Sequence, residues 1–278
     1  LMVTMRINSG PLHVQQFTHD TFGFLDGGWR ILHGQIPHND FYSALGPLTP
    51  FLIAAGLKIS DSVDAISYAA ILVYLFIVPL FAWIARSRLP IPWFAILCLH
   101  VGSCIVATRT LGFGVISYAM VYNRFGEALL LLLFTMLFIP PLGEYGMFRK
   151  TLEGFIAGIL VALAWFLKLN YFGIALAGIM LSAVLNRKGW HEIIAFLLGG
   201  IAVCILFFRG LGVSMHAMIR DMIMMSHAQA PNEKFLQLLM MIYVVLPYLL
   251  VAMGVLAALL MSRIPVAGKV KVVAVFIF

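Results

Sequence analysis

The sequence predicts an all-α integral membrane protein, a bundle of transmembrane helices with a long first loop that carries short helices. Hydrophobic residues make up 63% of the 278 residues and charged residues only 10%, whereas soluble domains carry about 25% charged residues. Apolar segments also alternate with short charged connectors along most of the chain. We therefore assign the net charge of +7 to connectors at a membrane rather than to a nucleic-acid surface.

Residues 1–62 are predicted to form the first loop and a short interfacial helix after it. The stretch from His19 to Pro47 reads HDTFGFLDGGWRILHGQIPHNDFYSALGP and is the longest run that no membrane span accommodates. Residues 48–60 are apolar but shorter than the ~20 residues that a span requires. We expect Pro47 to open an interfacial or re-entrant helix there, because proline favours the first helical turn.

A short helix is predicted inside the loop, over Thr21–His33, where apolar residues recur at helical spacing. Thr18 and Asp20 are both favoured residue types for its N-cap. Gly34 is typical of the position just past a helix end. The loop is therefore expected to hold a helix that presents Asp20 at its start.

Residues 63–278 are predicted to form the transmembrane bundle, with about seven spans of the length that a bilayer requires. A last apolar stretch, 264–278, is interpreted as a span cut off part way. The predicted spans are 63–85, 91–108, 124–142, 152–169, 171–186, 191–208 and 235–262.

The short connectors on one side of these spans carry nine basic and three acidic residues, a net charge of about +6 against about +1 on the other side. The positive-inside rule places the more basic side in the cytoplasm. The His19–Pro47 loop is then extracytoplasmic, together with residues 109–123, 168–170 and 209–234. The basic residues concerned are Arg86, Arg88, Arg149, Lys150, Arg187, Lys188, Arg263, Lys269 and Lys271.

Asp20 is the first candidate catalytic residue. A carboxylate at a helix start on the outer face suits a general base that takes the proton of an acceptor hydroxyl. The alternative is that Asp20 only caps the helix. His19, directly before it, is a candidate substrate-binding residue.

Asp40 is the second candidate, in a turn that Pro37 imposes. It suits a residue that orients the acceptor or binds a metal, and the alternative is ordinary turn formation. Asp26 and Arg30 are four residues apart on the predicted helix and are interpreted as a surface ion pair.

The sequence predicts no cofactor and no metal site. The histidines of the first segment follow no recognised ligand spacing, although a bound divalent metal stays as an alternative. The three cysteines lie in apolar segments and have neither disulfide nor metal spacing. The residues concerned are His13, His19, His33, His38, Cys98, Cys104 and Cys204.

Tyr122, Asn123 and Arg124 lie at the outer end of a predicted span, and Arg109 begins the same connector. Arginine suits phosphate because its guanidinium presents a fork of donors. The alternative is an aromatic and basic anchor at the membrane interface.

Lys168 and Asn170 lie where two predicted spans meet with almost no loop between them. A lysine in so apolar a run is costly unless it reaches water or an anion. Phosphate binding and snorkelling to the interface both satisfy that condition. Residues Val213–His227 are predicted to form an amphipathic surface helix.

These segments resemble the polytopic GT-C glycosyltransferases, relatives of the protein mannosyltransferases and of the lipid A aminoarabinose transferase. Three stretches carry the resemblance: the first loop from His19 to Leu48, then YNRFGEALL, then FLKLNYF. In that family a long first outer loop holds an acidic catalytic residue, and sugar passes from a polyprenyl-phosphate donor to an acceptor on the outer face.

The resemblance implies a function and site residues for this chain. Asp20 matches the acidic residue of the first loop, and Asp40 falls near a second polar position. Arg124 and Lys168 are candidates for the donor phosphate. The implied protein is an inverting glycosyltransferase of a bacterial inner (plasma) membrane. Its partners are a lipid-phosphate-linked sugar, membrane lipids, and a glycan, lipid or protein acceptor, with no nucleic acid.

The family pattern also has a helix before the first loop and further spans after Phe278, so the sequence is interpreted as a fragment.

Two other functions fit some of the sequence features. A transporter or flippase for a lipid-linked or anionic solute explains the same outer cations, but it predicts charged or broken helices near mid-membrane. A non-catalytic assembly subunit leaves the first loop unexplained.

Overall fold

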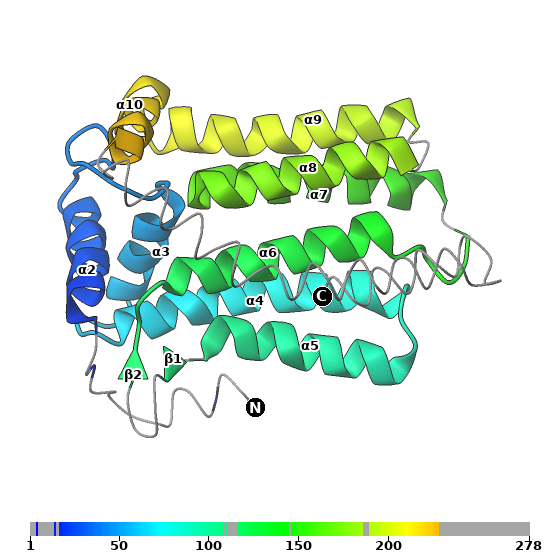
Figure 1. Ribbon diagram of the computed structural model, residues 1–278, viewed down its shortest axis with the longest axis horizontal. Helices are drawn as coiled ribbons and strands as arrows, with labels where there is room; N and C mark the ends of the chain where they lie inside the picture. Colours follow the sequence, from blue (N-terminus) through cyan, green and yellow to red (C-terminus); the bar gives the residue numbers. More distant parts are fainter. Residues whose placement is uncertain are drawn as a thin grey trace. The chain divides into compact units, whose positions relative to one another are not determined.

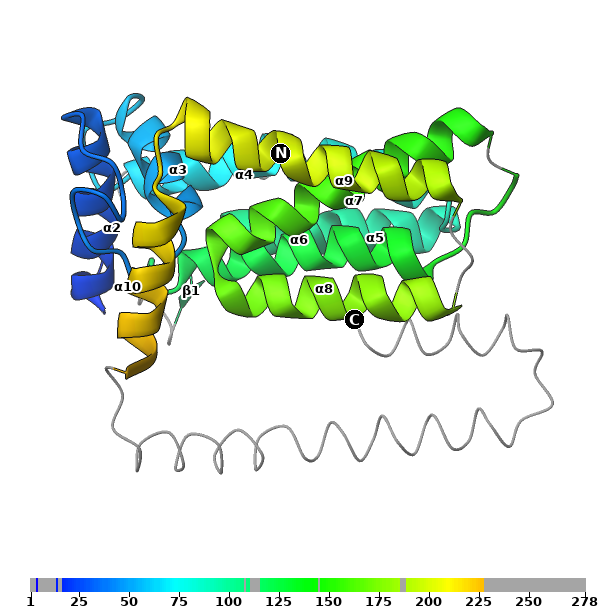
Figure 2. The same cartoon turned by 90° about the horizontal axis from the view of Figure 1, so that it is seen from above.

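The computed structural model describes residues 4, 14, 17–107, 109–110, 116–144, 146–185 and 189–227. The chain forms two compact units, residues 1–219 and residues 220–278. The described part of the first unit is a bundle of α-helices (Figures 1 and 2). In the second unit, Arg220 Nη2 lies 3.3 Å from Asp221 Oδ1.

Four segments are long and apolar enough to cross a membrane, which confirms the membrane-helix part of the predicted fold class. They are α4 (Ala65–Arg86), α6 (Val121–Phe138), α7 (Met147–Leu167), and Trp190–Gly210, in which α9 (Trp190–Ile205) continues into the π-helix η1 (Leu206–Gly210). The shorter apolar helices are α3 (Leu48–Leu57), α5 (Ile91–Val106) and α8 (Leu169–Leu185).

The helix boundaries correct several predicted ones. Helix α6 begins after Met120, whose backbone is left-handed (φ 57°), and it ends before Pro140 and Pro141, which lack the N–H that a helix needs. Helices α5 and α8 have 16 and 17 residues, so they are shorter than the usual span. The predicted spans 235–262 and 264–278 lie outside the described residues.

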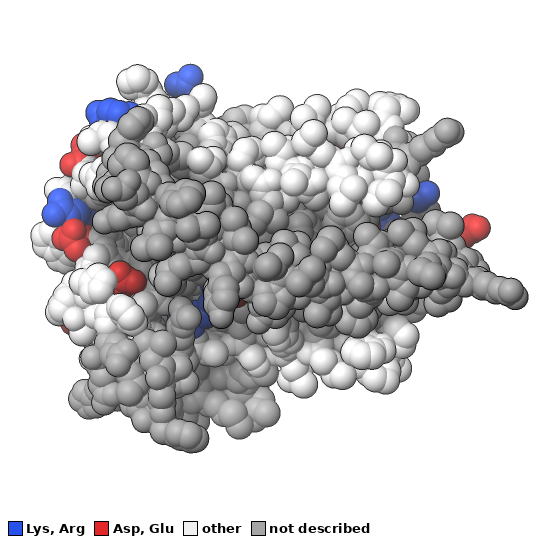
Figure 3. Space-filling model, viewed as in Figure 1, with Lys and Arg blue, Asp and Glu red and all other residues white. Residues whose placement is uncertain are grey.

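Successive helices of the bundle run in opposite directions, which sorts the connections between them to two ends (Figures 1 and 2). The α2 end holds α2, α3, the starts of α4 and α6, and the α7–α8 junction. The opposite end holds the connection 87–90, residues 139–144 after α6 and the start of α9. On the face in Figure 3, the described charged side chains gather toward these two ends.

Helix α2 (Thr18–Leu32) begins three residues earlier than predicted. Its N-cap is Phe17 in a left-handed conformation, and the Asp20 N–H donates to the Phe17 carbonyl at 3.1 Å. Asp20 is thus inside the first turn, and the prediction that Thr18 or Asp20 is the N-cap is wrong.

The end of α2 is as predicted, because Gly34 adopts φ 84° just past it. The Gly34 N–H donates to the Ile31 carbonyl and the Gln35 N–H to the Arg30 carbonyl, both at 3.0 Å. This is the Schellman arrangement, which satisfies the last carbonyls of the helix. The predicted Asp26–Arg30 pair is also present, with Arg30 Nε 2.7 Å from Asp26 Oδ2.

Two glycines let α2 lie close on α3. Gly27 and Gly28 are buried, and a Cβ on Gly28 would lie 2.8 Å from Ile53 Cγ2. Helix α3 begins after Pro47, as the proline predicted, and it packs between α2 and α4. The first loop is therefore held rigidly against the bundle.

The described residues also include one element that an all-α prediction omits. Strands β1 (Arg109–Thr110) and β2 (Ile116–Ser117) pair antiparallel, with Arg109 opposite Ser117. The predicted helix within Val213–His227 is present as α10 (Met215–His227).

Candidate active site

The candidate site lies at the α2 end and begins with Asp20. Asp20 lies in the first turn of α2, where the backbone N–H groups give the helix end a partial positive charge. The side chain of Asp20 is 30% exposed, and His19 Nε2 lies 3.2 Å from Asp20 Oδ1. The structure therefore pairs the two candidate residues His19 and Asp20 and leaves the carboxylate partly exposed.

Tyr122 links this carboxylate to the rest of the site. Its ring lies edge-to-face with Phe24, one turn after Asp20 on α2, at 6.1 Å between ring centroids. The Asp20 carboxylate is close enough to interact electrostatically with the Tyr122 hydroxyl. The first-loop motif and the YNR motif thus meet at one tyrosine.

Lys168 approaches the same tyrosine from another direction. Its Nζ lies 4.8 Å from the centre of the Tyr122 ring, a cation–π distance. Burial lowers the pKa of Lys168, because desolvation disfavours the charged form. Among the residues that the structure describes, no carboxylate lies within ion-pair distance of this ammonium.

The backbone explains why Lys168 is available at this point. Residue 168 is extended (φ −168°, ψ 137°) and separates α7 from α8. Its carbonyl accepts hydrogen bonds from the Tyr171 N–H at 3.1 Å and the Phe172 N–H at 3.3 Å, so it starts α8. The predicted near-absence of a loop is correct, and the junction directs the lysine side chain toward α6.

Packing between α6 and α8 holds this junction in place. The Tyr171 hydroxyl donates to the Asn123 carbonyl at 3.1 Å. A Cβ on Gly126 would collide with the Tyr171 ring, at 2.5 Å from its Cε2. Asn123 therefore contributes its backbone to packing, while Asn170 is exposed in the first turn of α8. The YNRFG and KLNY motifs are in direct contact.

Gly46 fixes the end of the first loop beside the same junction. Its N–H donates to the Leu167 carbonyl at 3.1 Å, and a Cβ there would collide with the Phe166 carbonyl. All three motifs that carry the family resemblance therefore converge within a few residues of Lys168.

The other two arginines predicted for the site are Arg124 and Arg109. Arg124 follows Tyr122 by two residues, which is about 200° around a helix. Its carbonyl accepts a hydrogen bond from Cys104 Sγ of α5 at 3.9 Å, and its charge acts on that thiol. The backbone of Arg124 thus contacts α5, whereas the side chain of Lys168 contacts the Tyr122 ring. The side chain of Arg109, in β1, is outside the described part.

Asp40 has the turn contacts that its alternative interpretation predicted. Its Oδ2 accepts a hydrogen bond from the Ile36 N–H at 2.7 Å, and its own N–H donates to the Ile36 carbonyl at 3.0 Å. Asp40 is exposed. Within the described ranges, no three His, Cys, Asp or Glu side chains gather in a way that could hold a metal ion.

Asn39 is a residue that sequence reasoning missed. Its amide donates to the Gly212 carbonyl and accepts from the Ser214 N–H, both at 2.9 Å. It ties the turn that carries Asp40 to the segment after η1. No local signal predicts this bond, because its partners are more than 170 residues away in the sequence.

Comparison with protein-family models, curated proteins and solved structures found no match. The resemblance to the GT-C glycosyltransferases therefore stays a prediction from the three sequence motifs. What the structure adds is their convergence on the Tyr122 ring.

Proposed function

We propose that the protein transfers a sugar from a polyprenyl-phosphate donor to an acceptor hydroxyl on the extracytoplasmic face of a bacterial inner membrane. One observation carries the proposal. Asp20 and Lys168, which carry opposite charges and come from separate elements, both approach Tyr122. They do so at one end of a bundle that has four helices of membrane-spanning character.

The two charges suit the two halves of an inverting transfer. Asp20 accepts the proton of the acceptor hydroxyl while the oxygen of that hydroxyl forms a bond to the anomeric carbon. The bond between that carbon and the phosphate oxygen breaks, and its electron pair stays with the phosphate. This leaving group needs positive charge rather than a proton, and the Lys168 ammonium supplies it.

The environment of each residue supports its role. Asp20 is partly exposed, so a polar acceptor reaches it from water. Lys168 is partly buried beside an aromatic face, where an electrostatic contact is stronger than in bulk water. A donor whose lipid tail stays in the bilayer and whose phosphate reaches the surface would meet both residues.

The other predicted residues have supporting roles in the proposal. Asn170 lies in the first turn of α8, two residues after Lys168, and Arg124 and Arg109 flank the outer connector, where they would contact further oxygens of the donor. His19 would hold the Asp20 carboxylate in position. Asp40 would act through the turn that it stabilises, rather than on the reacting atoms.

The test is sugar transfer in nanodiscs from a synthetic polyprenyl-phosphate sugar to a hydroxyl acceptor, with and without Asp20→Asn. The proposal expects transfer that depends on Asp20. Movement of a lipid-linked or anionic solute across the bilayer without sugar transfer would instead support the transporter alternative.

A further inference from the structure

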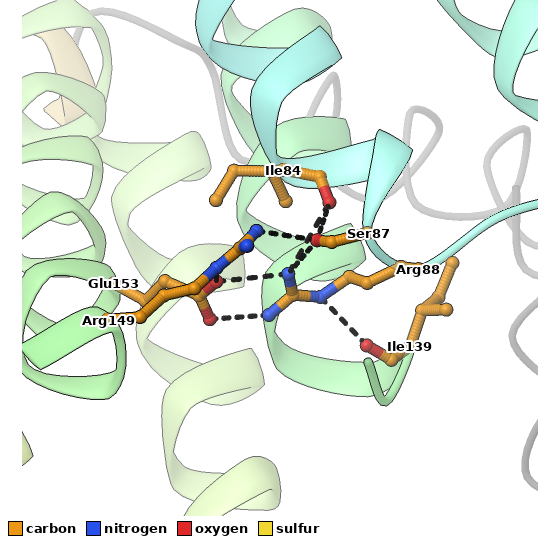
Figure 4. Close-up of polar contacts among 6 residues, drawn as sticks. All are labelled: Ile84, Ser87, Arg88, Ile139, Arg149 and Glu153. Carbon is orange, nitrogen blue, oxygen red and sulfur yellow. Dashed lines mark hydrogen bonds and ion pairs between the residues drawn. The ribbon is translucent and has the colours of Figure 1, made fainter. Parts of the chain in front are cut away.

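The opposite end of the bundle holds a partly buried charge network that the sequence did not predict (Figure 4). The side chain of Arg88 is only 2% exposed. Its Nη1 lies 3.1 Å from Glu153 Oε1 and its Nη2 lies 2.5 Å from Glu153 Oε2. Its Nε donates to the Ile139 carbonyl at 2.9 Å. This two-pronged ion pair neutralises the charge of Glu153 and joins the ends of α4, α6 and α7.

Arg149 adds a second cation to the same carboxylate. Its Nε is 3.4 Å from Glu153 Oε1, a longer contact than either of the Arg88 pair, and its Nη2 donates to Ser87 Oγ at 2.6 Å. Two guanidinium groups and one carboxylate give the network a charge of +1. The excess charge lies toward the surface, because the Arg149 side chain is 29% exposed.

The surface beside Arg149 is both basic and aromatic. Its guanidinium lies 4.9 Å from the centre of the Trp83 ring, which is 39% exposed. Arg86 precedes Ser87 and Lys150 follows Arg149 in the chain, and both side chains are exposed.

Tryptophans mark this end of the bundle as a boundary between membrane and water. Trp93 lies in the first turn of α5, and Trp190 is the first residue of α9. Both are exposed, by 54% and 71%. With Trp83, three of the five tryptophans of the chain are exposed at the same end, as in the aromatic belts of membrane proteins.

We propose that Trp83, Arg86, Arg149 and Lys150 form a binding site for the headgroup phosphate of an anionic phospholipid. Arg149 and the two exposed cations face the phosphate, and the Trp83 ring packs against the glycerol and the upper acyl chain. The buried Arg88–Glu153 pair holds Arg149 at the surface. Lipid is the expected source of the phosphate because the cations stand within an aromatic belt at the ends of apolar helices.

The inference is independent of sugar transfer, because the site lies at the other end of the bundle from Asp20 and Lys168. Its test is native mass spectrometry of the protein in a neutral detergent, titrated with phosphatidylglycerol, with phosphatidylcholine or with inorganic phosphate. We expect phosphatidylglycerol to bind in preference to phosphatidylcholine. Loss of one cation near an anionic headgroup should weaken binding about fivefold.

Arg86→Gln and Lys150→Gln are the preferred variants, because both side chains are exposed and their loss leaves the Arg88–Glu153 pair intact. Arg149→Gln is the third, with circular dichroism to confirm folding. Lys58→Gln, an exposed lysine after α3 at the α2 end, is the matched control and should bind normally. Equal binding of the two lipids, unchanged binding by Arg86→Gln and Lys150→Gln together, or equally tight binding of inorganic phosphate would overturn the proposal.

Discussion

Lys168 holds its ammonium 4.8 Å from the centre of the Tyr122 ring, and so joins the α7–α8 junction to the first turn of α6. Asp20 approaches the same tyrosine from α2. The tyrosine, the carboxylate and the ammonium come from three separate segments of the sequence, and among the described residues Asp20 and Lys168 form no direct ion pair. The proposed chemistry depends on that separation, since a direct Asp20–Lys168 ion pair would neutralise both groups.

Removing the Lys168 charge should impair turnover more than it impairs folding. The leaving phosphate gains charge in the transition state, so Lys168→Gln should lower kcat as well as donor affinity, by about 2–4 kcal/mol in transition-state stabilisation. Arg124→Gln should cost less, because Arg124 follows Tyr122 by two residues and so lies on another face of α6. Steady-state kinetics with a polyprenyl-phosphate sugar measure both. Equal losses for the two variants would contradict the placement of the phosphate at Lys168.

Donor binding should weaken as pH rises. The weakening should begin at a lower pH than it would if Lys168 had the pKa of an ordinary lysine. Burial lowers the pKa of Lys168, so the free protein loses this charge early as pH increases. A bound phosphate favours the charged form and raises the pKa again, and the donor should therefore bind with uptake of a proton when the pH is above the lowered pKa. Calorimetry in buffers of different ionisation enthalpy measures the uptake. Lys168→Gln should abolish it, and an unchanged uptake in that variant would assign the proton elsewhere.

Gly46→Ala should destabilise the first loop. The added Cβ would collide with the Phe166 carbonyl, and overpacking against a fixed backbone costs about 1–3 kcal/mol. Gly23→Ala is the control, because a Cβ there meets nothing within 4 Å and alanine is the better helix former by about 1 kcal/mol. In detergent, the midpoint of thermal unfolding should therefore fall for Gly46→Ala and rise for Gly23→Ala. A harmless Gly46→Ala would mean that the loop is not seated on α7.

Much of this arrangement follows from local rules. Three predicted features depend on neighbouring residues and are present: the Gly34 end of α2, the Asp26–Arg30 pair and the start of α3 at Pro47. The break between α7 and α8 is also present, at residue 168 rather than at the predicted residue 170. The N-cap of α2 was predicted wrongly, because the left-handed turn at Phe17 supplies the first carbonyl instead of a capping side chain.

Features that need distant partners were not predictable in this way. The sequence does not reveal that Tyr122 faces Phe24 and Lys168, or that Asn39 binds Gly212 and Ser214, because these contacts are tertiary. The sequence analysis assigns Arg88 to a basic connector, whereas in the structure Arg88 forms a largely buried pair with Glu153.

That buried pair makes its own prediction for stability. Glu153→Gln would leave Arg88 buried beside a neutral group, and breaking one side of a buried pair typically costs about 3–5 kcal/mol. Glu144→Gln, at an exposed carboxylate of the same end, should change stability little. Chemical unfolding in detergent compares the two variants. Similar midpoints would show that the Arg88 charge is solvated rather than held by Glu153.

The turnover of Asp20→Asn tests the proposed mechanism most directly. Asparagine keeps the size of the side chain, and Asp20 is not the N-cap of α2, so the helix should form normally. Loss of a general base typically lowers the rate by about 10²–10⁴. Asp26→Asn on the same helix, whose carboxylate pairs with Arg30, should transfer sugar at nearly the normal rate. If Asp20→Asn transfers sugar as fast as the unmodified protein, then Asp20 is not the base and the proposed mechanism is wrong.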